Sequence, residues 1–141
     1  MVGNFVYNDG GRAKANYKGK SDDCVVRAIA IATGISYQEV YDALGVRMCS
    51  ERLKRKRGNP RNGVHKSTYK PYIASLGWKW TPTMGIGTGC TVHLKGLELP
   101  SGRLIVSCSG HLVAVIDGVV HDTYDPTRNG TRCVYGFYWE K

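Results

Sequence analysis

The stretch that most constrains the fold is residues 110–126, because it predicts a β-hairpin. Two runs rich in apolar and β-branched residues flank Asp117-Gly118, and this dipeptide supplies the two positive φ angles that a two-residue type I′ turn requires. Such a turn fixes the strand register, so that Ile116 pairs with Val119 and each earlier residue pairs with one later residue. Alternate side chains then lie on opposite faces of the hairpin.

The predicted register brings a histidine and an aspartate together. One face of the hairpin carries His111, Val113, Val115, Val120, Asp122 and Tyr124. Asp122 is the diagonal neighbour of His111, about 7–8 Å away between Cα atoms, a separation that the two side chains can bridge. A carboxylate that accepts from one imidazole nitrogen leaves the other nitrogen free to act as a base. Two interpretations follow, an oriented His–Asp pair and an ordinary strand histidine beside a solvated aspartate.

A base of this kind needs a nucleophile, and Cys24 is the candidate. Residues 21–23 are typical of a helix N-cap and first turn, and the dense apolar run 25–33 stops at Gly34. The positive end of a helix lowers the pKa of a thiol, and its free N–H groups can hold an oxyanion. The aspartates just before the cysteine raise that pKa. The alternative is a buried core cysteine, and we expect catalysis only if His111 lies beside Cys24.

Length and composition predict one globular domain. The chain has 141 residues, of which 42% are hydrophobic and 22% charged, with 18 glycines, which is typical of a folded domain with many turns. No apolar run reaches membrane-spanning length, and Met1 is not followed by a signal-peptide pattern. We therefore expect a cytoplasmic protein without a membrane partner.

The cysteine and glycine patterns favour a protein without a cofactor. The five cysteines are an odd number and form no C-x-x-C pair, so we expect reduced thiols and neither a disulfide framework nor a zinc site. Gly85, Gly87 and Gly89 lack the Gly-Lys-Ser/Thr ending of a phosphate-binding loop. We expect no metal and no cofactor, and we interpret residues 84–90 as a glycine-rich flap beside a cleft.

The remaining pattern predicts helices first and an antiparallel sheet second. Residues 1–20 are interpreted as an irregular lead-in with one short strand at 5–7. Helices are expected at 25–33, from the capping box at Ser36 through Leu44 before Gly45, and at 66–76 before Gly77, with a kink or later start at Pro71. Strands are expected at 78–81, 91–94, 103–108 and 133–139 besides the hairpin. The predicted fold class is α+β, in a single domain over residues 1–141.

Residues 47–65 form a predicted basic loop that carries most of the net charge of +9. Its clustered cations are Arg52, Lys54, Arg55, Lys56, Arg57 and Arg61. Such a patch attracts phosphate or an acidic protein surface, whereas a loop that only aids solubility has the same composition. The basic loop therefore favours a second class of function, an inert protein that binds nucleic acid or an acidic host protein.

With Cys24 on the first helix, and histidine and aspartate on successive strands, the chain resembles papain-like cysteine peptidases. Asp-Asp-Cys at a helix start and Gly-His before an apolar strand are similar in particular to the bacteriocin-leader peptidase and transglutaminase-like branches. The resemblance implies a Cys24, His111 and Asp122 triad acting on a peptide, isopeptide or amide bond of a peptide or protein substrate. Those branches often place Asp-Pro after the histidine strand, as in Asp125-Pro126, which favours Asp125, whereas the hairpin register favours Asp122.

Papain-like enzymes also carry an oxyanion glutamine a few residues before the cysteine, and the resemblance implies Asn16 in that role, since Lys18 occupies the neighbourhood. The phrases Asp-Cys-Val-Val-Arg-Ala-Ile-Ala-Ile-Ala-Thr-Gly and Leu-Gly-Trp-Lys-Trp-Thr-Pro-Thr-Met are similar to small proteins of tailed bacteriophages. That second resemblance implies a location in the host cytoplasm. The sequence thus predicts a phage-encoded cysteine hydrolase.

Overall fold

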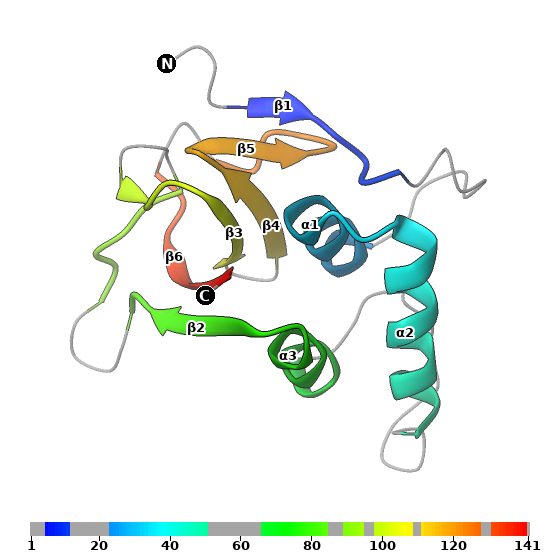
Figure 1. Cartoon of the computed structure of the whole chain (residues 1–141). Helices are drawn as coiled ribbons and strands as arrows, with labels where there is room; N and C mark the ends of the chain where they lie inside the picture. Colours follow the sequence, from blue (N-terminus) through cyan, green and yellow to red (C-terminus); the bar gives the residue numbers. More distant parts are fainter. Residues whose placement is uncertain are drawn as a thin grey trace.

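The computed structural model describes residues 5–11, 23–50, 66–84, 89–94, 98–108, 111–127 and 131–140. Most of the predicted lead-in and basic loop, and the middle of the glycine-rich flap, lie outside these residues. The described part consists of three helices and a six-stranded sheet (Figure 1). The α+β class predicted from the sequence is confirmed.

The sheet has the strand order β1-β5-β4-β3-β6-β2. Its strands are β1 (Phe5–Tyr7), β2 (Trp78–Pro82), β3 (Arg103–Cys108), β4 (His111–Ile116), β5 (Val119–Asp122) and β6 (Val134–Glu140). Neighbouring strands are antiparallel except for β1 and β5, which run parallel. The prediction of an entirely antiparallel sheet is wrong at this edge. Parallel strands need a long connection between them, and the chain from β1 to β5 contains all three helices.

The hairpin of β4 and β5 has the predicted turn and register. Asp117 and Gly118 have φ angles of 50° and 81°, both positive as a type I′ turn requires. Ile116 pairs with Val119 as predicted. On its other side β4 pairs with β3, so His111, the first residue of β4, stands at the end of a central strand.

The first helix, α1 (Cys24–Thr33), matches the prediction closely. Gly34 has the left-handed conformation with a φ of 80°, and its N–H donates to the carbonyl of Ala30 at 2.9 Å. Glycine favours this C-terminal cap because it has no Cβ. Asp23 stands at the N-cap position, but its side chain makes no capping hydrogen bond. Its carboxylate is fully buried instead, which ties it to the site described below.

The second helix, α2 (Tyr37–Ser50), runs further than predicted. Ser36 caps its start, since Oγ accepts the N–H of Glu39 at 3.2 Å, but the helix continues through Gly45. A glycine inside a helix costs about 1 kcal/mol. Packing of the fully buried Leu44 against the core offsets that cost, so the predicted end is wrong.

The third helix, α3 (Lys66–Ser75), contains Pro71 without an interruption. It starts at the predicted residue, so the alternative of a later start is wrong, and Gly77 with a φ of 88° follows its end. A proline removes one backbone hydrogen bond from a helix, and the buried Tyr72 and Ile73 hold this one against the core. Among the described helices, none has both the length and the apolar character of a membrane-spanning segment.

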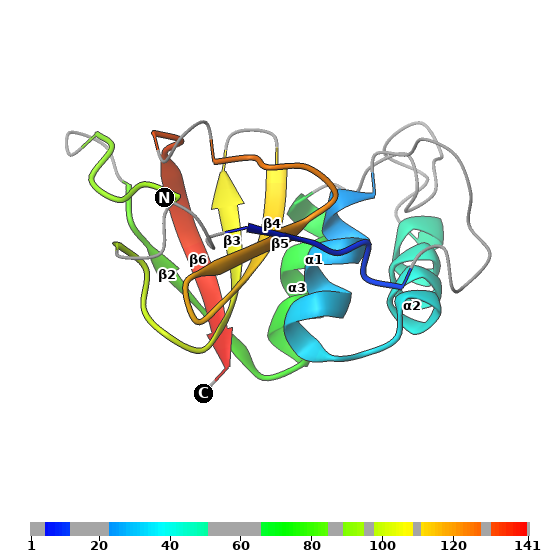
Figure 2. The same cartoon turned by 90° about the horizontal axis from the view of Figure 1, so that it is seen from above.

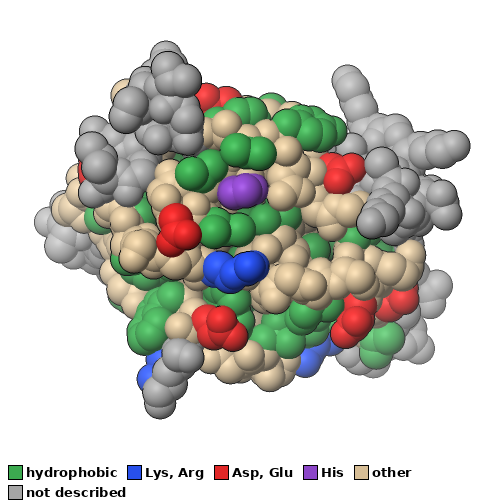
Figure 3. All heavy atoms as spheres, turned by 45° about the horizontal axis from the view of Figure 1, so that its top comes forward, with side chains coloured by type: hydrophobic (Ala, Val, Ile, Leu, Met, Phe, Trp, Pro, Cys, Tyr) green, Lys and Arg blue, Asp and Glu red, His purple; other side chains and the backbone are tan. Residues whose placement is uncertain are grey.

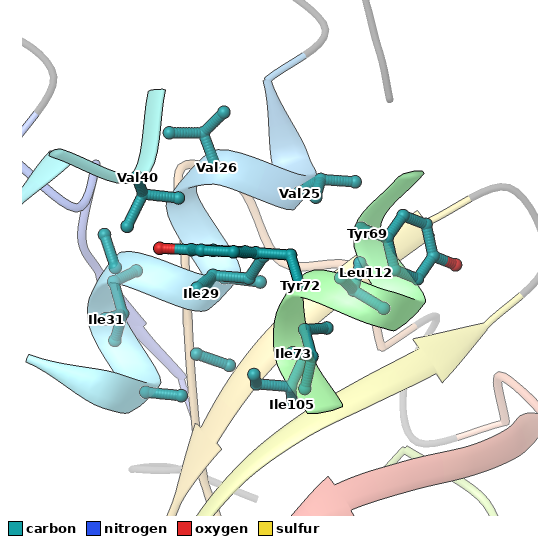
Figure 4. Packing of buried hydrophobic residues seen from close by; sticks show 14 of the residues in the cluster. Val25, Val26, Ile29, Ile31, Val40, Tyr69, Tyr72, Ile73, Ile105 and Leu112 are labelled. Carbon is teal, nitrogen blue, oxygen red and sulfur yellow. The ribbon is translucent and has the colours of Figure 1, made fainter. Parts of the chain in front are cut away.

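All three helices lie on the same side of the sheet (Figure 2). α1 packs on β4 and β3, and α2 packs against α1 and α3. Figure 4 shows the core between them, where Ile29 of α1 and Ile73 of α3 approach Ile105 and Leu112 of the sheet. The other face of the sheet buries a second cluster, which contains Leu94, Leu99, Leu104, Val106, Cys108, Val113, Val115, Val120 and Val134. The sheet is thus buried on both faces, and α1 is fixed against its centre.

Cys90 and Cys133, which are 43 residues apart, form a disulfide. The expectation of reduced thiols is wrong for this pair, because cysteine spacing carries no information about a contact made by tertiary structure. An isolated β-bridge joins His93 to Cys133, where the sequence predicted a strand over residues 91–94. The disulfide therefore fastens this irregular segment to the start of β6.

Candidate active site

Cys24 is the first residue of α1, and its half-buried thiol meets the start of β4. The thiol is hydrogen-bonded to His111 and to the backbone N–H of Leu112. Burial acts to raise the pKa of Cys24, but these hydrogen bonds and the positive charges of His111 and Arg27 together lower it. Catalysis is expected only if His111 lies beside Cys24, and in the structure it does.

His111 and Asp122 form a buried pair in which Nε2 lies 2.6 Å from Oδ2 of the carboxylate. Burial acts to lower the pKa of His111, but its hydrogen bonds to Asp122 and Cys24 raise that pKa to about 9. Burial likewise opposes ionisation of Asp122, yet the bond and charge of His111 hold the pKa of the carboxyl below its ordinary value. Because Nε2 is taken by the carboxylate, Nδ1 is the nitrogen left for the thiol.

Arg27 of α1 also belongs to this group, although no role was predicted for it from sequence. The side chain is buried, its Nη1 bonds Oδ1 of Asp23, and its Nη2 lies 3.0 Å from Oδ1 of Asp122. The hydroxyl of Tyr37 donates to the other oxygen of Asp23 at 2.6 Å. The expected rise of the Cys24 pKa beside an aspartate is therefore absent, because the charge of Asp23 is matched by Arg27. A lone arginine inside the apolar run 25–33 was the available signal.

Asp125, the alternative third member, has a different task. Its Oδ1 accepts the backbone N–H of Thr127 at 3.0 Å and the hydroxyl of the same residue at 2.7 Å. These bonds order the turn around Pro126. Asp122 is the aspartate that contacts His111, as the hairpin register predicted.

Aromatic side chains border the site on the side of β1 and β5. The ring of Tyr124 lies with its centroid 5.5 Å from that of His111 and is 51% exposed. β1 leaves Val6 and Tyr7 exposed, and Tyr7 pairs with Asp122 across the sheet. Figure 3 shows the face of the molecule on which β1 and β5 lie, with hydrophobic side chains among polar ones. The exposed ring of Tyr124 beside His111 makes the border of the site partly apolar.

Several predicted positions lie outside the described residues. Asn16, the candidate for an oxyanion, is one of them, and so are the six cations of the basic patch, Arg52, Lys54, Arg55, Lys56, Arg57 and Arg61. Within the part of the chain that the structure describes, no group of three histidine, cysteine or acidic side chains is arranged to hold a metal ion. The backbone N–H of Leu112 is the described donor at the thiol.

Comparison with models of protein families, with curated proteins and with solved structures gives no match to this chain. A thiol with a lowered pKa, an imidazole beside it and a buried carboxylate behind the imidazole are the groups that nucleophilic catalysis at a carbonyl needs.

Proposed function

We propose that this protein is a cysteine-dependent acyl-transfer enzyme that hydrolyses a peptide, isopeptide or amide bond. Cys24 is the nucleophile, His111 takes the proton of the thiol, gives it to the leaving nitrogen and then acts as the base for water, and Asp122 orients the imidazole. The observation that carries the proposal is the meeting of three groups, since His111 lies beside the Cys24 thiol and lowers its pKa, and Nε2 of His111 lies 2.6 Å from Oδ2 of the buried Asp122. The local sequence supports the same assignment, because the nucleophile begins a helix.

The charges of the site support a reactive thiolate. At neutral pH the raised pKa of His111 keeps the imidazole protonated, and the lowered pKa of Cys24 favours the thiolate beside it. A thiolate, and not a thiol, attacks carbon. The imidazolium in turn faces the ionised Asp122, so its positive charge is matched inside the protein.

The reaction follows from these positions. Sγ of Cys24 attacks the carbonyl carbon, the new S–C bond forms, and the carbonyl electron pair moves to the oxygen. The imidazolium of His111 gives its proton to the leaving nitrogen, the C–N bond breaks, and an amine leaves a thioester behind. His111 then takes a proton from water as that water attacks the thioester carbon, the S–C bond breaks, and the acid leaves with the Cys24 thiolate and the His111 imidazolium restored.

The proposal extends to the architecture and the setting. We infer a papain-like arrangement from the helix that carries Cys24 and the successive strands that carry His111 and Asp122. We also propose a peptide or protein substrate and a phage protein that acts in the cytoplasm of its host. The partly apolar border formed by Tyr7 and Tyr124 is suited to apolar or aromatic side chains of such a substrate.

Alkylation and acyl transfer test the proposal together. Iodoacetamide at neutral pH should label Cys24 well ahead of Cys108, a buried cysteine of β3, and His111→Ala should slow that labelling. With p-nitrophenyl acetate, wild-type protein should release a burst of nitrophenol and carry one acetyl group on Cys24, and Cys24→Ala should do neither. Equal labelling of both cysteines, together with no acetyl-enzyme, would refute the proposed function.

A further inference from the structure

Burial of the charged Arg27 side chain is unfavourable unless other groups compensate for it. Its side chain is buried in a helix whose neighbouring residues are apolar, and a buried charge costs several kcal/mol unless it is paired and hydrogen-bonded. Its partners are two buried carboxylates, Asp23 at the start of its own helix and Asp122 on β5. Arg27 therefore links the helix that carries Cys24 to the strand that carries Asp122.

The two oxygens of the Asp122 carboxylate have different hydrogen-bond partners. Oδ1 accepts Nη2 of Arg27 at 3.0 Å and the backbone N–H of Thr123 at 2.7 Å. Oδ2 faces Nε2 of His111 at 2.6 Å. Two donors thus fix one oxygen, and the plane of the carboxylate is set so that the other oxygen meets the imidazole.

We propose that Arg27 is the positioning residue of the triad, holding Asp122 ionised and turned towards His111 while it fixes the N-terminus of α1 to β5. This inference rests on the proposed function, since it assigns Arg27 a part in the same reaction. The side chain acts through Asp122 and does not touch the reacting atoms. It is a distinct claim from a packing role, because it predicts a change in the ionisation of the site.

The surroundings of Arg27 support a role in charge as well as in packing. Cys24 lies three residues before it, which places both side chains on one face of α1, and the charge of Arg27 contributes to the lowered pKa of Cys24 and of Asp122. From the other elements, Asp122 of β5 and His111 of β4 face the same cluster, with Tyr124 beyond them. Tyr37 of α2 holds Asp23 in place on the far side.

A second arginine provides a matched control. Arg103 of β3 donates from Nη1 to the carbonyls of Ile31 and Ala32 at 3.4 and 3.2 Å, so it fixes the C-terminal end of α1 to the sheet. Eight residues of helix separate Cys24 from Ala32, about 12 Å along the axis. Arg103→Met therefore removes a similar anchor of the same helix without touching the site.

The test compares Arg27→Met, Arg27→Lys and Arg103→Met with wild-type protein. Two quantities are measured against pH, the rate of Cys24 alkylation by iodoacetamide and the titration of the Asp122 carboxyl carbon by NMR. We expect Arg27→Met to move the acid limb of alkylation upward by about one pH unit, a roughly tenfold lower rate on that limb, and to raise the Asp122 pKa. Arg27→Lys should recover part of both changes, and Arg103→Met should lower the melting temperature with both profiles unchanged.

The outcomes separate this inference from the proposed function. If Arg27→Met keeps the wild-type alkylation profile and the wild-type Asp122 titration, or if Arg103→Met moves them equally, Arg27 is a packing residue and the inference is wrong. If wild-type Cys24 is not activated at all, the proposed function fails, and the Asp122 titration still decides whether Arg27 holds that carboxylate. Should Arg27→Met not fold, Asp23→Asn with Arg27→Met removes the unpaired buried acid and is judged by the same readouts.

Discussion

Replacing Asp122 by asparagine is the sharpest test of the acid–base pair. Asp122→Asn keeps the size of the side chain but removes the negative charge 2.6 Å from Nε2 of His111. The pKa of His111 is about 9 against an ordinary 6.5, and each pH unit corresponds to about 1.4 kcal/mol. The surroundings therefore favour the charged imidazole by about 3 kcal/mol, and the bond to Asp122 is the largest favourable contribution.

We expect the pKa of His111 to fall by more than about one pH unit in Asp122→Asn, a change of about 1.4 kcal/mol. NMR titration of the imidazole carbons and nitrogens measures it in each protein. Asp125→Asn is the control, because its carboxylate bonds Thr127 and not His111, and it should leave the titration near that of wild type. A larger fall in Asp125→Asn than in Asp122→Asn would refute both the assignment and the hairpin argument behind it.

The same pair makes folding stability depend on pH. Folding raises the pKa of His111, so its contribution to stability is fully present below about pH 6.5 and is lost as the pH rises towards about 9. Urea unfolding in a Cys24→Ala background removes the opposite dependence of the thiol, and also its share in raising the His111 pKa, so the loss should begin near pH 6.5 and end below pH 9. Asp122→Asn should move it to lower pH.

Three further outcomes can be checked. Replacing Cys90 and Cys133 by serine should cost up to about 4 kcal/mol of unfolding free energy, the chain-entropy value for a loop of 43 residues, and an unchanged denaturant curve would contradict this. Gly136→Ala should cost about 1–3 kcal/mol, because a Cβ there would lie 2.4 Å from the Trp80 ring, and calorimetry measures it. If the basic loop binds duplex DNA, affinity should fall by roughly 0.9 log unit per log unit of salt for each phosphate that it neutralises. Neutralising residues 54–57 should abolish this binding. Equal binding by that variant would show that the basic patch is not the DNA-binding site.

The parts of the site that sequence could predict are those decided by neighbours in the chain. Asp117-Gly118 sets the turn, the turn sets the register, and the register brings Asp122 to His111 over a separation of 11 residues. The left-handed conformation of Gly34 likewise places the end of α1. Each of these features is determined by residues close together in the sequence and depends little on tertiary contacts.

The parts that sequence could not predict depend on contacts between distant segments. Arg27 and Asp122 are 95 residues apart, and no periodicity says which strand a buried arginine will face. The same holds for the disulfide of Cys90 and Cys133. The sequence does show that Arg27 is unusual, because a charged residue in an apolar helical run requires a buried partner of opposite charge.

The difference between these two sequence separations has a consequence for when the Cys24 site assembles during folding. A hairpin such as β4 and β5 forms in microseconds, so His111 and Asp122, which are 11 positions apart in the chain, can meet early during folding. The anchoring of α1 by Arg27 spans 95 residues and must wait for the slower closure of long-range contacts. Cys24 therefore meets His111 only when the whole domain has folded, and under the proposed function a nascent or partly unfolded chain carries an ordinary thiol with no base beside it.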